Sequence, residues 1–292
     1  MVGFLKSVPA AALVYAPCEI VGDMPEAVGM AYRETGDAAA PPVLFVHGYP
    51  ESSFMWREAL AAVAEAGWRG VAPDLPGYGD SPPGDRPGTW EEHVKSLERF
   101  RAALSLDDLA LVTHDWGVLI GLRWACDHAG AARALVISDG GFFADRRWHD
   151  MANVMRTPGE GERMMESLNR EAFGAFMGQA SSAFGPEALD EYWKGYATRE
   201  RRARHLEMYR SGDFSKLEPY EGCLAALGVP ALVLWGAQDR FASVRMASRF
   251  AEELPDSELR VFDDAGHFVW EDEPAGTSAA LVDFIERRVR NA

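Results

Sequence analysis

Cysteine is scarce in this sequence of 292 residues, which contains only Cys18, Cys126 and Cys223. An odd number of widely spaced cysteines does not make a disulfide framework or a zinc site. We therefore expect a reduced protein without a bound metal. We also expect it to be cytoplasmic, because that compartment keeps thiols reduced.

Long apolar runs and a surplus of basic residues are also missing. No segment is apolar for long enough to span a membrane. The 29 basic residues are outnumbered by 45 acidic ones, which gives a net charge of −16. Such a surface does not attract nucleic acids or anionic membranes, so we expect neither as a partner. Residues 1–20 have a short apolar stretch but a single lysine, and we interpret them as a strand or loop rather than a signal peptide.

What the sequence does contain is a regular alternation of two patterns. Short apolar segments bounded by glycine and proline predict buried strands, and helical patterns such as 52–67 and 89–106 lie between them. Strands that alternate with helices in this way indicate an α/β fold with a mostly parallel, doubly wound sheet. The predicted strands lie within 41–50, 68–83, 109–117, 132–141, 229–239 and 258–267.

One interval interrupts this alternation. Between the fourth and fifth predicted strands there is no strand signal, and the chain is rich in Met, Phe, Tyr, Arg and Glu at helical spacings, as in 187–210. We interpret residues 142–213 as a helical cap. The core is then made of residues 1–141 and 214–292.

Three ionisable residues follow predicted strands, at the edge where open α/β sheets bind ligands: Asp115, Asp239 and His267. Asp115 is the central residue of "THDWG" (113–117), which has the form of a nucleophile elbow, a sharp turn from strand to helix. An isolated aspartate at the end of a strand more often caps a helix. Its place in this elbow favours a nucleophile.

An aspartate nucleophile predicts a particular chemistry. With an unperturbed pKa of about 3.9, it is ionised at neutral pH without the help of a base. Its attack on an sp³ carbon that carries a halide or an epoxide oxygen gives an alkyl ester. Water activated by His267 would hydrolyse that ester, and Asp239 would orient His267. The backbone N–H groups of Tyr49 and Trp116 would form the oxyanion hole. This reaction needs no cofactor.

The motifs "HGYP" (47–50), "HDWG" (114–117), "GAQD" (236–239) and "DAGHF" (264–268) occur in this order. Together they resemble the α/β-hydrolase superfamily, in the branch of haloalkane dehalogenases and epoxide hydrolases. The resemblance covers nearly the whole core and implies the α/β-hydrolase fold. Some dehalogenases place the orienting acid after the preceding strand, so Asp139 is an alternative to Asp239. His47 and His114 are interpreted as structural neighbours of the site.

The two activities of this branch need different groups around the leaving atom. A dehalogenase needs two halide donors, for which we name Trp116 and the cap residue Trp148. Tyr49 stands where many dehalogenases have asparagine. An epoxide hydrolase needs two cap tyrosines, and only Tyr192 resembles one of them. Two further segments, "SSFMWR" (52–57) and "GLRWACDH" (121–128), resemble dehalogenases.

We therefore predict a haloalkane dehalogenase acting on a small apolar substrate, with an epoxide hydrolase as the alternative. A fluoroacetate-type dehalogenase resembles "HDRG" at the elbow, whereas this chain has Trp116 at the arginine position. Because fold does not fix function, a non-catalytic receptor or an esterase-like member is a third interpretation.

Overall fold

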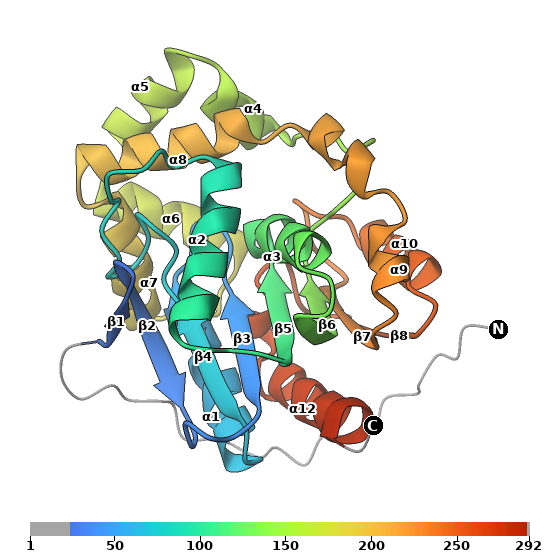
Figure 1. Cartoon of the computed structure of the whole chain (residues 1–292). Helices are drawn as coiled ribbons and strands as arrows, with labels where there is room; N and C mark the ends of the chain where they lie inside the picture. The colour runs from blue at the N-terminus through green and yellow to red at the C-terminus, as the bar shows by residue number, and fades with distance from the viewer. Residues whose placement is uncertain (1–23, 291–292) are drawn as a thin grey trace.

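Eight strands form one sheet in the computed structural model, which describes residues 24–290 (Figure 1). Their order is β1-β2-β4-β3-β5-β6-β7-β8, and the pairs from β4 through β8 are parallel. The predicted α/β fold with a mostly parallel sheet is confirmed. Residues 1–20, interpreted above as a strand or loop, lie outside the described residues. The strands are Glu26–Ala27 (β1), Met30–Thr35 (β2), Pro42–Val46 (β3), Arg69–Pro73 (β4), Leu109–His114 (β5), Ala132–Ser138 (β6), Ala231–Gly236 (β7) and Ser257–Phe262 (β8).

The antiparallel strands β1 and β2 extend the sheet beyond the predicted set. β2 reads "MAYRET", and its polar second half leaves Glu34 and Thr35 only half-buried. An antiparallel strand of this kind has no continuous apolar run, so the pattern that identifies the central strands does not identify this one.

Helices cover both faces of the sheet (Figure 1). On one face α1 (Arg57–Glu65) packs against α12 (Pro274–Ile285), and on the other α2 (Trp90–Ala103) packs against α3 (Trp116–Asp127). All six residues of β5 are buried, as expected for a strand covered on both sides. The other helical segments of the core are η1 (Ser53–Trp56), η3 (Phe214–Tyr220), α9 (Cys223–Leu227), α10 (Arg245–Glu253), α11 (Val269–Asp272) and η4 (Glu286–Arg290).

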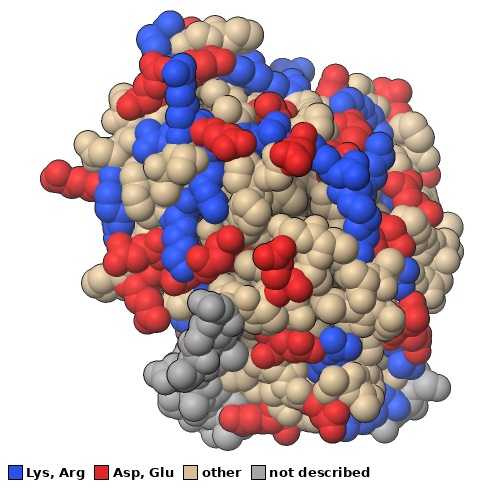
Figure 2. Space-filling model, turned by 60° about the vertical axis from the view of Figure 1, so that its left-hand side comes forward, with Lys and Arg blue, Asp and Glu red and all other residues tan. Residues whose placement is uncertain are grey.

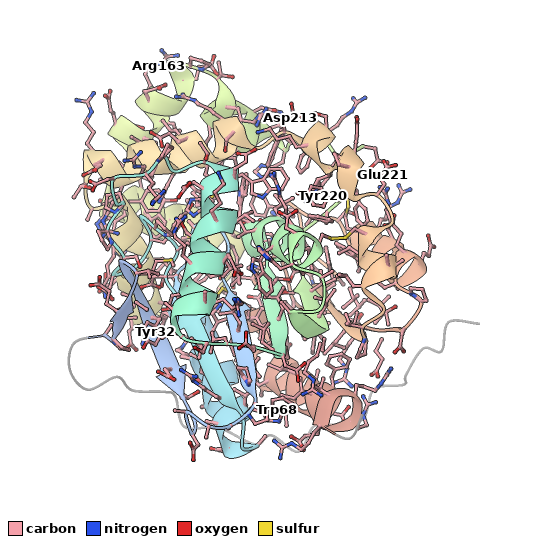
Figure 3. The ribbon with its side chains drawn as sticks, viewed as in Figure 1. Tyr32, Trp68, Arg163, Asp213, Tyr220 and Glu221 are labelled. Carbon is pink, nitrogen blue, oxygen red and sulfur yellow. A yellow bond between two sulfur atoms is a disulfide. The ribbon has the colours of Figure 1, made fainter. Side chains whose placement is uncertain are left out.

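A group of helices lies between β6 and β7, where the sequence predicts the cap. Arg163 on α5 and Asp213 after α8 lie at the opposite end of the molecule from Trp68 (Figure 3). Within the segment 187–210 a new α-helix begins after Thr198, which caps it through a hydrogen bond from Arg201 N to its hydroxyl. The helices are α4 (Asp150–Arg156), α5 (Glu160–Ser167), α6 (Arg170–Ala180), α7 (Pro186–Trp193), η2 (Lys194–Tyr196) and α8 (Arg199–Ser211).

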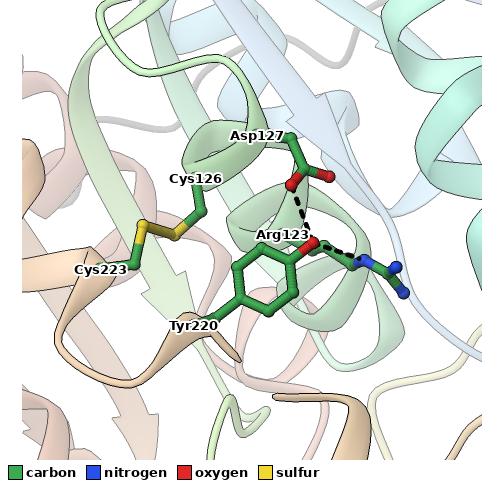
Figure 4. The surroundings of a disulfide bond; sticks show 5 residues. All are labelled: Arg123, Cys126, Asp127, Tyr220 and Cys223. Atoms are coloured by element: carbon green, nitrogen blue, oxygen red, sulfur yellow. Dashed lines mark hydrogen bonds between the residues drawn. A yellow bond between two sulfur atoms is a disulfide. The ribbon is translucent and has the colours of Figure 1, made fainter. Parts of the chain in front are cut away.

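A disulfide joins Cys126 on α3 to Cys223 on α9 (Figure 4). The expectation of a fully reduced protein is therefore wrong for this pair. The two cysteines are 97 residues apart in sequence, but their Cα atoms are 6.1 Å apart, within the range that a disulfide spans. Beside them Tyr220 accepts a hydrogen bond from Arg123 and donates one to Asp127. Because disulfides are rare in the cytosol, the cysteines no longer support a cytoplasmic location.

Acidic and basic side chains are interspersed on the face shown in Figure 2. Many of them form ion pairs, such as Arg210 with Glu162 and Lys194 with Asp80. Within residues 24–290, no helix is long and apolar enough to cross a membrane.

Neutral histidines are buried where the cap meets the core. His205 on α8 stacks on Tyr78 of the core, with ring centroids 4.5 Å apart. Nearby on α2, His93 is buried, and neither of its ring nitrogens has a hydrogen-bond partner among the described residues. Burial, followed by the charge of His47, lowers the pKa of His93 to about 4. The ring is therefore uncharged at neutral pH.

We expect the substitution His93→Phe to make stability less dependent on pH. The pKa of His93 is about 4 in the folded protein and about 6.5 when unfolded, so unfolding takes up a proton between these values. Lowering the pH from 7 to 5 should then cost the wild type about 2 kcal/mol more unfolding free energy than it costs the variant. Urea denaturation at both pH values measures this difference. An equal loss in both proteins would contradict it, and the half-exposed His128→Phe serves as control.

Candidate active site

Asp115 sits in a tight turn between β5 and α3. Its backbone angles are φ 48° and ψ −116°, a conformation that residues other than glycine rarely adopt. The turn also requires glycine at position 117, because a Cβ there would lie 2.1 Å from the carbonyl oxygen of Val46. This crowding explains why the motif "THDWG" (113–117) has glycine two positions after Asp115. The strand must turn within one residue, which holds the Asp115 side chain out at the edge of the sheet.

The loop after β3 supplies a backbone donor to this carboxylate. The N–H of Tyr49 donates to Oδ1 of Asp115 at 2.8 Å. The second expected donor, the backbone N–H of Trp116, makes no hydrogen bond to the Asp115 carboxylate within the described part of the chain. His47 fixes the loop, because its Nδ1 pairs with the Gly48 carbonyl and its Nε2 accepts from Leu75 N.

The structure brings together the three ionisable residues that the sequence singles out. His267 Nε2 lies 3.4 Å from Oδ2 of Asp115, and His267 Nδ1 lies 2.9 Å from Oδ2 of Asp239. The other oxygen of Asp239 accepts from the backbone N–H groups of Phe241 and Ala242. These bonds fix the Asp239 carboxylate, which in turn fixes the orientation of the His267 ring.

Electrostatics favours an ionised Asp115 beside a protonated His267. Burial alone would raise the pKa of Asp115, but the hydrogen bond and charge of His267 outweigh burial and lower it to about 2. Burial alone would lower the pKa of His267. The carboxylates of Asp239 and Asp115 outweigh it and raise this pKa well above its usual value. Asp115 is therefore an anion in the resting protein.

The geometry favours Asp239 over Asp139 as the partner of His267. Oδ1 of Asp139 accepts from Gly236 N at 3.0 Å, and Oδ2 has no hydrogen-bond partner in the described residues. Burial, followed by the charge of Asp239, raises the pKa of Asp139 well above its usual value. Asp139 is thus bound to the backbone and is not the partner of His267.

Two further buried ionisable groups, Glu51 and His114, belong to the surroundings of the site. Glu51 Oε2 is 3.2 Å from Nε2 of His114, and both side chains are fully buried. Burial, together with the charge of Glu271, keeps the pKa of Glu51 well above its usual value. Burial and the charge of His267 lower the pKa of His114 to about 3. The His114 ring is therefore neutral at neutral pH. Glu51 was not among the predicted site residues.

A cavity of about 20 Å³ lies over Asp115. That volume holds about one water molecule. A larger cleft of about 360 Å³ adjoins the cavity, and Phe176, Phe241 and His267 line both spaces. The cavity is lined by Tyr49, Pro50, Asp115, His149, Met151, Phe176, Tyr209, Phe241, His267 and Phe268. Within residues 24–290 no cluster of three or more His, Cys, Asp or Glu residues is arranged to hold a metal ion.

The sequence of residues 41–274 matches a family model described as the alpha/beta hydrolase fold. The chain belongs to this family. A haloalkane dehalogenase from Bradyrhizobium diazoefficiens is 29% identical over 283 residues, covering 88% of this chain and 90% of the relative. Epoxide hydrolase A from Mycobacterium tuberculosis is 27% identical over 323 residues, covering 92% and 98%. The solved structure of haloalkane dehalogenase DbeA from Bradyrhizobium elkani aligns with a TM-score of 0.78 at 28% identity, covering 90% of this chain and 96% of that one.

The two tryptophans predicted to bind halide lie together, but Trp148 does not reach the cavity. Trp116 lies next to the nucleophile, and Trp148 stacks on it with ring centroids 5.4 Å apart. Trp148 does not line the cavity and packs against Phe214 at 4.3 Å. Trp148 therefore contributes to packing and does not face the cavity.

Tyr192 is turned away from the nucleophile. Its hydroxyl donates to Glu271, which also pairs with Arg57 at 2.7 Å. The cap tyrosine that lines the cavity is Tyr209, on α8. The indole of Trp116 contacts the Tyr209 hydroxyl and lowers its pKa, although burial and Asp115 raise that pKa more strongly. Sequence reasoning missed Tyr209 because no motif marks it within its helix.

Proposed function

We propose that this chain is a hydrolase of carbon–halogen bonds, a haloalkane dehalogenase that converts a haloalkane and water into an alcohol and a halide. The observation that carries the proposal is the ionised Asp115, held by Tyr49 N at 2.8 Å and with His267 Nε2 at 3.4 Å. The relatives named above support it, since two of the three are haloalkane dehalogenases. The cytoplasmic location predicted from composition stays a prediction.

In the first step an oxygen of Asp115 attacks the carbon that bears the halogen. An oxygen–carbon bond forms, the carbon–halogen bond breaks, and its electron pair leaves on the halide. The product is an alkyl ester of Asp115. Because the carboxylate is already an anion, no proton has to be removed before this attack.

In the second step water attacks the carbonyl carbon of the ester. Formation of the ester removes the negative charge of Asp115, one of the two charges that raise the pKa of His267. The pKa of His267 therefore falls, and the ring releases its proton to solvent. The neutral ring then takes a proton from the attacking water, so that hydroxide adds to the carbonyl carbon. The negative charge that develops on the ester oxygen is stabilised by Tyr49 N. When this intermediate collapses, the bond between the carbonyl carbon and the alkyl oxygen breaks, and the alkoxide takes the proton of the added hydroxyl to leave as the alcohol. Asp115 is again an anion and His267 is again protonated.

The cavity matches a small apolar substrate, because most of its lining residues are aromatic or apolar. A four-carbon chain needs more room than about 20 Å³, so we expect Phe176 and Phe241 to move when it binds. Both side chains lie between the cavity and the wider cleft, which is the route by which we expect the substrate to enter.

One observation favours epoxide opening as a second candidate. Tyr209 lines the cavity beside Asp115, where a phenol could donate a proton to an epoxide oxygen. Tyr209 replaces Tyr192 in this role, because the hydroxyl of Tyr192 is bound to Glu271. No second tyrosine of the cap lines the cavity among the described residues, which is why carbon–halogen cleavage is preferred.

Halide release and diol formation, measured in parallel, distinguish the two candidates. We expect halide from 1-bromobutane and 1,2-dibromoethane, and little diol from styrene oxide. Asp115→Ala serves as the blank for both assays. Diol without halide would replace the proposal by epoxide hydrolysis. A folded protein that produces neither would contradict both.

A further inference from the structure

His149 has one ring nitrogen committed to the backbone and the other free. It is the N-cap of α4, and its Nδ1 accepts from Ala152 N at 3.3 Å. A ring nitrogen that accepts a hydrogen bond carries no proton, so in the neutral ring the proton is on Nε2. Nε2 has no hydrogen-bond partner in residues 24–290 and is not among the fully buried polar atoms. His149 therefore has an N–H group available to a bound molecule.

The ring of His149 lies at the wall of the cavity that holds Asp115 and His267. Phe241 contacts both imidazoles, with ring centroids 5.2 Å from His149 and 5.0 Å from His267. Both histidines therefore pack against the same phenyl ring at the wall of the cavity.

The ring of His149 is neutral at neutral pH. Burial lowers its pKa, and the charge of Asp115, which acts in the opposite direction, does not restore it. A neutral ring presents one N–H donor beside the Asp115 carboxylate without forming an ion pair with it. It leaves the nucleophile free to attack.

The two tryptophans predicted as halide donors, Trp116 and Trp148, do not reach the part of the cavity over Asp115. Trp116 is covered by Trp148 on one face, and its indole contacts the hydroxyl of Tyr209. Neither tryptophan lines the cavity, whereas His149 and Tyr209 do. The polar groups that face a leaving atom over Asp115 therefore come from the loop before α4 and from α8.

We infer that His149 binds the leaving group, donating its Nε2–H to the halogen as the carbon–halogen bond breaks. This inference rests on the proposed function. The halogen gains negative charge as the oxygen–carbon bond forms, so a donor at this place stabilises the transition state more than the substrate. The effect is larger for chloride than for iodide, because chloride is the stronger hydrogen-bond acceptor and the poorer leaving group.

Two substitutions distinguish the role of His149 as the N-cap of α4 from its role as an N–H donor. The Asn side chain reproduces the position of Nδ1, so His149→Asn keeps the cap of α4 and removes the donor. The Gln side chain reaches the position of Nε2, so His149→Gln supplies an N–H there without the cap. We expect His149→Asn to lower kcat/KM for 1-chlorobutane about 10- to 100-fold, and for 1-iodobutane less, with little change in Tm. We expect His149→Gln to recover most of that activity while lowering Tm.

Bromide binding gives a test that does not depend on turnover. We expect bromide, titrated at constant ionic strength and followed by tryptophan fluorescence, to bind the wild type more tightly than His149→Asn. Equal bromide affinity, or equal losses for chloride and iodide substrates, would overturn the inference even if the wild type releases halide. Bromide binding that depends on His149, without halide release from any substrate, would support the site and overturn the proposed function. A wild type that binds no bromide would overturn the site.

Discussion

Replacing Asp115 with alanine is expected to lower kcat/KM for 1-bromobutane by at least about 10⁴-fold, equivalent to about 5 kcal/mol in the activation barrier. The variant lacks the atom that forms the bond to the substrate. No other carboxylate can take its place, because Asp239 is held by His267 and two backbone N–H groups. Asp139 and Glu51 are buried, and burial raises the pKa of each well above its usual value, which favours the protonated, non-nucleophilic form. Initial rates of halide release measure this loss.

The control for this variant is Asp108→Ala at the opposite end of the same strand. Asp108 also has a positive φ, 54° against 48° for Asp115, so both substitutions place alanine at a positive φ that residues other than glycine rarely adopt. Asp108 is exposed and pairs with Arg133, far from the cavity lining. We expect the control to keep wild-type activity. Substantial halide release by a folded Asp115→Ala protein would remove Asp115 from the mechanism.

Replacing His267 with glutamine is expected to stop the reaction after its first half. Attack by Asp115 needs no base, so the variant should release close to one halide ion per protein molecule. Hydrolysis of the ester needs His267, so no alcohol should follow and steady-state turnover should fall by at least about 10³-fold. Rapid-mixing measurement of halide against alcohol tests this separation of the two steps.

The control for this variant is His128→Gln, since His128 is half-exposed at the end of α3 and does not line the cavity. It should show steady turnover with equal amounts of halide and alcohol. If His267→Gln produced halide and alcohol in equal amounts at a reduced rate, a direct attack of water on the substrate would replace the two-step mechanism.

The residues at strand ends could be predicted because topology places them. Parallel strands with buried, apolar sequences bring their carboxyl ends to one edge, so the positions after β5, β7 and β8 had to lie close together. Asp115, Asp239 and His267 are those positions. The strand order brings these residues to one edge. The structure then shows His267 at 2.9 Å from the Asp239 carboxylate and 3.4 Å from the Asp115 carboxylate.

The cap residues could not be predicted in the same way. A helical pattern shows which residues share a face, but not which face turns toward the cavity. Tyr192 and Tyr209 lie on neighbouring cap helices, and only the second reaches the site. The role of His149 depends on a hydrogen bond to the backbone, which fixes its tautomer and which no motif records. The Cys126–Cys223 pair was missed because sequence distance does not limit contact in space.

The central claim is that turnover passes through an alkyl ester on Asp115, and the mass of His267→Gln after exposure to 1-bromobutane tests it most directly. We predict that the intact protein gains the mass of one butyl group. Fragmentation of its peptides should place that group on Asp115. The double variant that carries both His267→Gln and Asp115→Ala should show no such increase in mass. An unmodified protein that has nevertheless released halide, or a butyl group on any other residue, would contradict the account.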